Sequence, residues 1–207
     1  MKGLIIKDFL VLKQNSKIYI FMIAGYTIYS FIIKDLSMIS AMIALWSFMA
    51  NISAFSYDEK AKWDLFILSA SITRRQLVLS KYVFALLICI VGVAIVLPMN
   101  IAITLLYNFD FLNMIYLLLL VCGLAYLLSI ILYPLIFKFG VDKARTFMTI
   151  IFMIPMLAPL LIESMGISIV IDQTLLNYFP ILGGIGLAIL TMISYQISCN
   201  IMLKKDL

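Results

Sequence analysis

Long uninterrupted apolar runs constrain this chain more than any other feature of its sequence. They lie at 18–33, 36–56, 82–107, 111–137, 146–162 and 178–203. An apolar run of about 17–25 residues is long enough to cross a bilayer as a helix. Because 65% of the residues are hydrophobic and only 12% are charged, an integral membrane protein is the class that fits.

The apolar runs are predicted to be helices. Only helices and closed barrels satisfy every backbone polar group in lipid, and these runs lack the alternating pattern of barrel strands. We therefore expect an all-α integral membrane protein with six transmembrane helices. No repeat or linker divides the chain, so residues 1–207 are expected to form a single transmembrane domain.

The basic residues predict the orientation of this domain. All of the 15 Lys and Arg residues except Lys34 fall in the N-terminal segment, the second and fourth connections, and the C-terminal tail. Cytoplasmic loops carry such an excess of positive charge. We expect a multi-pass protein of the cell (plasma) membrane with both termini cytoplasmic. Since the net charge of +5 follows this pattern, it does not indicate a nucleic-acid partner.

Residues 1–17 read as an amphipathic helix on the inner membrane surface. At about 100° per residue, the four lysines fall within an arc of roughly 140°. Helices of this type lie in the headgroup plane, and a cytoplasmic extension of the first span is the alternative. Asp8 interrupts the apolar face, whose members are Leu4, Ile5, Phe9, Val11 and Leu12.

The connection between spans five and six, residues 163–177, is half apolar. A loop exposed to water does not need this many isoleucine, valine and leucine residues. We expect a re-entrant segment that dips into the outer leaflet. Pro155 and Pro159 lie just before it and are expected to kink the fifth span.

The connection at 57–81 gathers charge in an otherwise apolar chain. Ser56 and Glu59 form a capping-box pattern, and Thr73 and Gln76 form a second one. We therefore predict a helix beginning at Ser56, a short elbow, and a helix that continues into the third span. The first of these helices carries Trp63, Phe66 and Ile67, which are positioned to contact either the lipid interface or a groove in a partner protein.

The sequence offers no internal source of energy for transport. The spans hold almost no ionisable residues, Glu163 at an outer edge being the nearest, whereas ion-coupled transporters carry them within the bilayer. No Gly is followed by Lys, as a Walker A motif requires. There is no histidine for a catalytic triad or a His-ligated metal. A second chain would have to supply the energy, and 57–81 is the docking surface that we expect it to use.

The features that carry a family resemblance are the six-span layout, the N-terminal MKGLIIKDFLVLKQ, and the two stretches YDEKAKWDLFILSASITRRQLVLSKY and PLIFKFGVDKAR. With these features the chain resembles the permease subunits of type-2 ABC exporters of the small bacterial kind. The resemblance covers essentially the whole chain. The size and layout are similar to the branch that exports cytolytic amphipathic peptides.

The resemblance implies a non-catalytic permease with no cofactor of its own, because ATP and Mg are held by a separate ABC ATPase. A second permease copy, either identical or a paralogue, completes the pathway, and the cargo is an amphipathic peptide or similar hydrophobic compound. A cytoplasmic coupling helix at about Asp58 to Leu68 fits the ATPase. The ATPase-coupling candidates are Asp58, Glu59, Lys60, Lys62, Trp63, Asp64, Phe66, Arg74 and Arg75.

Polar and aromatic residues within the spans are candidates for the translocation path. The ordinary alternative for each of them is a hydrogen bond between packed helices or an anchor at the membrane interface. These candidates are Tyr26, Tyr29, Asn51, Asn100 and Tyr133.

Three other functions remain open from the sequence. A stand-alone immunity or accessory membrane protein would need no ATPase. A membrane-embedded lipid-modifying enzyme would need clustered acid–base groups, but the acidic residues of 57–81 are interleaved with lysines. The substrate-binding subunit of a vitamin importer would need a polar pocket within the spans.

Overall fold

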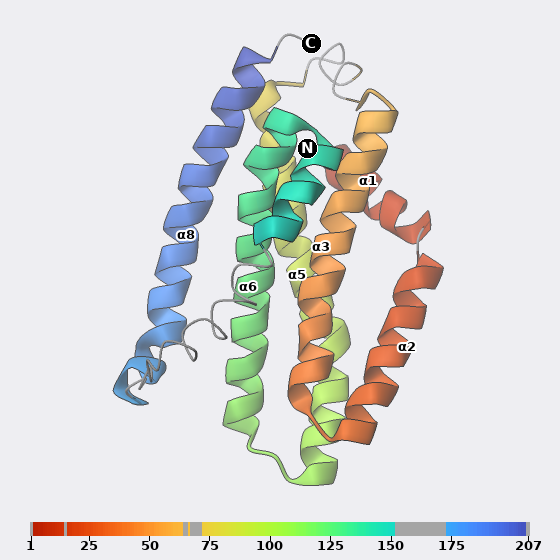
Figure 1. The fold of residues 1–207 in the computed structure, drawn as a ribbon, viewed down its shortest axis with the longest axis vertical. Coiled ribbons are helices and arrows are strands. Elements are labelled where there is room, and N and C mark those ends of the chain that lie inside the picture. The colour runs from red at the N-terminus through yellow and green to blue at the C-terminus, as the bar shows by residue number, and fades with distance from the viewer. Residues whose placement is uncertain (1, 15, 64–65, 67–71, 152–172, 206–207) are drawn as a thin grey trace.

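The computed structural model describes residues 2–14, 16–63, 66, 72–151 and 173–205, and within these ranges it contains helices and no strands. A further helical stretch covers 141–151. The main helices, labelled in Figure 1, are α1 (Lys2–Gln14), α2 (Ser16–Ile33), α3 (Leu36–Lys60), α5 (Arg74–Tyr107), α6 (Phe111–Phe139) and α8 (Gln173–Lys204).

Five helices of the described ranges are long and apolar enough to cross a membrane: α2, α3, α5, α6 and the Leu182–Lys204 part of α8. Of the expected fifth span, 146–151 is helical and the remainder lies outside the described residues. The expected re-entrant segment also lies outside them up to residue 172. Its last residues, 173–177, instead belong to α8. Six spans and a re-entrant segment therefore stay predictions.

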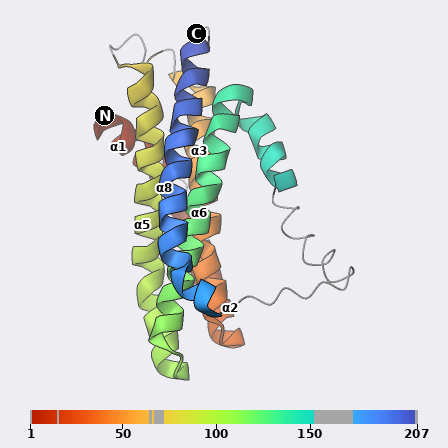
Figure 2. The same ribbon diagram turned by 90° about the vertical axis from the view of Figure 1, so that its left-hand side faces the viewer.

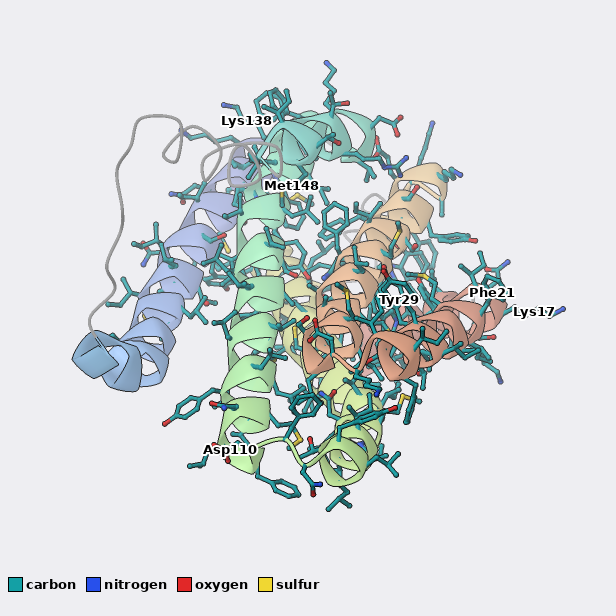
Figure 3. All side chains as sticks on the ribbon, turned by 60° about the horizontal axis from the view of Figure 1, so that its bottom comes forward. Lys17, Phe21, Tyr29, Asp110, Lys138 and Met148 are labelled. Atoms are coloured by element: carbon teal, nitrogen blue, oxygen red, sulfur yellow. The ribbon has the colours of Figure 1, made fainter. Side chains whose placement is uncertain are left out.

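The long helices run side by side, with α3, α6 and α8 in one direction and α2 and α5 in the other (Figures 1 and 2). The C-terminal ends of α3, α6 and α8 and the start of α5 meet at the end of the molecule that also carries α1. We call this the basic end. Within the bundle α6 packs against α3, α5 and α8. Helix α2 packs mainly on α3 and leaves its outer side open, with Phe21 81% exposed (Figure 3).

The two turns at the opposite end use the same chemistry. Lys34 and Asn108 have left-handed backbones, with φ of 60° and 54°, and follow the last residues of α2 and α5. Asp35 then accepts a hydrogen bond from the Ser37 amide at 2.8 Å, and Asp110 accepts one from the Leu112 amide at 3.2 Å. Each aspartate caps the helix that follows, so these acidic residues specify sharp reversals.

At the start of α5 the second predicted capping box is confirmed. The Thr73 hydroxyl accepts from the Gln76 amide, and the Gln76 side chain accepts from the Thr73 amide, both at 3.3 Å. The helix then runs without a break from Arg74 into the membrane span, as expected.

The first predicted capping box, at Ser56 and Glu59, is wrong. Both residues lie inside α3, which continues to Lys60. An N-cap residue needs a non-helical backbone, and nothing in the preceding sequence from Asn51 to Phe55 breaks the helix. No separate helix begins at Ser56. The charged residues Asp58 and Glu59 instead form the last turn of a long helix.

Helix α1 packs against protein along one side. Leu4 and Leu12 are buried against the bundle, whereas Ile6 and Leu10 are exposed, and its contacts are with α3 and α5. Asp8, expected to interrupt the apolar face, lies in the middle of that buried side with 1% of its surface exposed. Contact of the opposite side with lipid stays a prediction.

Polar contacts join α5, α6 and α8 within the bundle. The Tyr82 hydroxyl lies 2.6 Å from Ser194 Oγ and 2.9 Å from Ser198 Oγ. Ser194 uses its one proton to donate to the Ile130 carbonyl at 2.7 Å, so Tyr82 donates to Ser194. The Tyr82 ring also packs edge-on against Tyr133.

We predict that Tyr82→Phe lowers the stability of the bundle by about 1 kcal/mol, the usual scale of one hydrogen bond between membrane helices. Reversible unfolding in mixed micelles measures this change. Tyr116→Phe, on the exposed surface of α6, is the matched control and should leave stability unchanged. Equal stabilities of the two variants would contradict the role of the hydroxyl.

Candidate functional site

The basic end encloses a cluster of four charged side chains, Lys7, Asp8, Asp58 and Lys81, which we call the buried ion cluster. The Lys81 ammonium donates to both Asp8 carboxylate oxygens at 2.9 Å and to Asp58 Oδ2 at 2.6 Å. Lys7 contacts Asp8 Oδ1 at 2.9 Å and also donates to Asp58 Oδ1. The two cations and two anions balance, and they connect α1, α3 and α5.

The cluster is shielded from water on most sides. The exposed fractions of the side chains are 4% for Lys81, 1% for Asp8 and 9% for Asp58, and Lys7 on the outer side is 21% exposed. All three ammonium protons of Lys81 have an acceptor. Burying an ion is costly unless it is paired in this way, so each member of the cluster depends on the others.

Sequence reasoning missed this cluster because it assigned Lys81 to a loop and treated Asp8 as a defect in the apolar face of α1. The signal was nonetheless present. Lys81 directly precedes an apolar run, and Asp8 stands between Leu4 and Leu12 on the side of α1 that is buried. Two opposite charges that are each out of place are candidates to pair with one another.

A second set of polar contacts extends from the cluster into the bundle. The Tyr133 hydroxyl lies 2.9 Å from the Lys81 carbonyl and 2.5 Å from Asn51 Oδ1. Asn51 donates to the Ser47 carbonyl at 2.7 Å and to Ser129 Oγ at 3.0 Å. Tyr133 and Asn51 are fully buried. These two path candidates hold α3, α5 and α6 together.

The other path candidates lie elsewhere. Asn100 is fully buried and donates to Ser40 Oγ at 3.0 Å. Tyr29 is 49% exposed on α2 (Figure 3), and Tyr26 on the same helix is half-buried. Together with Gly25 they line part of a shallow hollow of about 400 Å³. The structure thus brings Asn51 and Tyr133 together, brings Tyr26 and Tyr29 together, and keeps these pairs apart.

Three of the coupling candidates are occupied by contacts within the chain. Asp58 belongs to the buried ion cluster, and Glu59 accepts from the Val141 amide at 2.9 Å. Arg74 donates from one guanidinium nitrogen to three carbonyls at the C-terminal end of α8, at 2.8–3.1 Å. A cation there satisfies carbonyls that lack a helical partner and complements the helix dipole.

The remaining described candidates face outward or sit at the surface. Lys60, Lys62 and Arg75 are exposed, and Phe66 is 61% exposed. The Trp63 ring stacks with Phe66 at a centroid distance of 5.2 Å and receives the Lys7 ammonium 5.0 Å above its face. Lys7 therefore links the buried ion cluster to the segment that follows α3. Asp64 lies outside the described residues.

The contacts of the buried ion cluster join helices to one another. In the part of the chain that the structure describes, no group of three or more His, Cys, Asp or Glu side chains is placed to hold a metal ion. The carboxylates of Asp8 and Asp58 are both engaged by lysines. What the arrangement does physically is fix α1, the end of α3 and the start of α5 relative to one another.

We predict that Lys81→Met destabilises the protein by about 3–5 kcal/mol, because it leaves Asp8 and Asp58 buried with Lys7 as their one remaining cation. Adding Asp8→Leu should recover part of the loss by restoring charge balance. Thermal unfolding in detergent and the yield of monodisperse protein measure both effects. Lys62→Met, at an exposed lysine, is the control. A double variant less stable than Lys81→Met alone would contradict this account.

Comparison with known proteins agrees with the membrane architecture. Residues 3–203 match the family model described as ABC-2 family transporter protein. No curated protein and no solved structure matches the sequence significantly. The family match covers nearly the whole chain, including α1, the buried ion cluster and all five candidate spans. The chain belongs to the ABC-2 family of transporter proteins, as a membrane-embedded permease component of an ABC transporter.

Proposed function

We propose that this chain is the permease subunit of an ATP-driven exporter that moves amphipathic peptides or similar hydrophobic compounds out of the cell. The family implies an ABC ATPase as partner. The observation that carries the proposal is the surface at the basic end. Exposed residues lie there beside the buried ion cluster: Lys60, Lys62, Phe66 and Arg75.

The outward-facing residues have the composition of a docking site. Exposed aromatic side chains anchor protein interfaces, and Phe66 packs against the Trp63 ring, whose centroid also lies 5.0 Å from the Lys7 ammonium. The neighbouring lysines provide charge for steering a partner. We propose that these residues, with Asp64, form the contact with the ATPase. We propose that Asp58, Glu59 and Arg74 instead fix the helices that carry this contact surface.

The orientation follows from charge. Helix α1, the ends of α3 and α8 and the start of α5 lie at the basic end in both Figures 1 and 2, and positive charge favours the cytoplasmic side. We place the basic end in the cytoplasm of a cell whose plasma membrane holds the bundle. Helix α6 ends at the basic end and α8 begins at the opposite one, which supports a sixth crossing between them.

Helix α2 supports the proposal of a second permease copy, identical or a paralogue. Its packing is mainly against α3, and its outer side is open along most of its length. Gly25 has no neighbouring atom within 4 Å of where a Cβ would stand. Small residues allow membrane helices to approach closely. The aromatic hollow around Gly25, with the hydroxyls of Tyr26 and Tyr29, suits an amphipathic cargo that has both apolar and polar groups.

We predict that Lys62→Glu combined with Phe66→Ala reduces retention of a co-expressed candidate ABC ATPase at least tenfold, since truncating one interface anchor costs about 2 kcal/mol or more. Co-purification in detergent measures the retained ATPase. Lys13→Glu combined with Lys204→Glu, also exposed at the basic end, should retain it. A wild-type chain that retains no ATPase would reject the exporter and favour a stand-alone immunity or accessory protein.

We also predict that Tyr26→Ala combined with Tyr29→Ala slows export while the ATPase stays bound. The measurement is ATP-dependent uptake of a fluorescent amphipathic helical peptide into inverted vesicles. Tyr116→Ala, another exposed tyrosine within a span, is the control. Unchanged uptake in the double variant would remove the α2 hollow from the proposed path.

A further inference from the structure

A single residue separates α6 from the helical residues 141–151. The Gly140 amide donates to the Ile136 carbonyl at 2.9 Å and closes α6, while the Gly140 carbonyl accepts from the Ala144 amide at 3.1 Å and opens the next helix. Its backbone has φ 83° and ψ 171°. A positive φ of this kind favours glycine. Figure 2 shows the chain turning sharply away from α6 at this point.

Gly140 occupies the N-cap position of the second helix but has no side chain with which to cap it. A helix start leaves amide groups without acceptors, and an N-cap side chain normally supplies one. Here Glu59 of α3 does so, because its Oε2 accepts from the Val141 amide at 2.9 Å. A Cβ on Gly140 would stand 3.1 Å from Glu59 Oε1, so the glycine also makes room for the carboxylate.

Glu59 lies in the last turn of α3, next to two other parts of the basic end. Asp58 before it belongs to the buried ion cluster. After it, the Lys62 amide donates to the Glu59 carbonyl at 3.2 Å, and Trp63 begins the outward-facing surface. The carboxylate of Glu59 therefore stands between the surface proposed for the ATPase and the start of another helix.

The rest of this helix is attached by apolar contacts. Val141, Ala144 and Met148 are buried in the same core as Phe55 and Phe137, and Figure 3 labels Met148 on this face. Apolar contact is non-directional and tolerates sliding. A charge-assisted hydrogen bond to a backbone amide is short and directional. The Glu59 contact thus sets a spacing that the apolar face alone does not set.

We propose that Glu59 is a positioning residue that makes the start of helix 141–151 follow the end of α3. When the ATPase displaces the segment after α3, the carboxylate passes the movement across to the Gly140 turn. Residues 146–151 of this helix begin the expected fifth span, so the movement would reach that span. This inference rests on the proposed ATPase docking, and it assigns Glu59 to transmission in place of direct contact.

Distance measurements between spin labels test the proposal. Labels on non-natural amino acids at Tyr57 and Arg145, both exposed, report the spacing between α3 and helix 141–151 in nanodiscs. With the permease alone, wild type should give a narrow distribution and Glu59→Ala a broadened or shifted one. Glu59→Gln keeps an oxygen acceptor and should stay close to wild type. Asp142→Asn, an exposed acid in the first turn of the same helix, is the matched control.

Adding the ATPase with ATP and vanadate tests the transmission step. The wild-type distance should shift, and in Glu59→Ala the shift should be lost although the ATPase is retained. If Glu59→Ala does not purify, Glu59→Asp, which keeps the charge and shortens the reach, takes its place. The proposal is overturned if Glu59→Ala, measured without the ATPase, shows the wild-type distance distribution. It is also overturned if the ATP-driven change in that distance persists in Glu59→Ala. A wild-type chain that binds no ATPase contradicts the proposed function instead, and the permease-alone comparison still decides whether Glu59 sets the spacing.

Discussion

One buried ammonium group organises the basic end of this protein. Lys81 stands at the start of the apolar part of α5, where it is almost completely removed from water. It is stabilised there by Asp8 from α1 and Asp58 from α3, which reach it from two sides. The cost of leaving any one of these charges unpaired in such surroundings exceeds what a surface ion pair contributes. The position of α1 and the end of α3 both follow from this requirement.

The buried ion cluster divides the charged residues of the basic end into two kinds. Asp58, Glu59 and Arg74 hold helices together, by an ion pair, a helix N-cap and a helix C-terminal contact respectively. Lys60 and Lys62 are free to meet another molecule at the surface. A concentration of charge next to a membrane is therefore not one continuous docking surface. Part of it fixes the helices beneath the residues that we propose to contact the ATPase.

The sequence predicted the elements that depend on neighbouring residues. Apolar runs located the five candidate spans of the described residues, and local patterns located the start of α5 at Thr73. The same local pattern failed at Ser56, because a capping box has meaning only where the preceding chain leaves the helix. Local patterns did not specify partners distant in sequence, although Asp8 and Lys81 each stood out as a charge beside apolar residues. Asp8 and Lys81 are 73 positions apart, and Glu59 and Val141 are 82 apart. In each pair, the residues around one member do not identify its distant partner.

The interior of the bundle bears on where a cargo travels. Asn51, Tyr133 and Ser129 are buried and satisfy one another's hydrogen bonds. A route through the centre of one bundle would have to break these bonds and expose polar groups within the membrane, at a cost for each unpaired group. A route along the open side of α2 breaks none of them, and Tyr26 and Tyr29 line the hollow there. The satisfied hydrogen bonds of Asn51, Tyr133 and Ser129 thus favour the proposed path at the surface of α2, between this chain and the proposed second copy, over a path within a single chain.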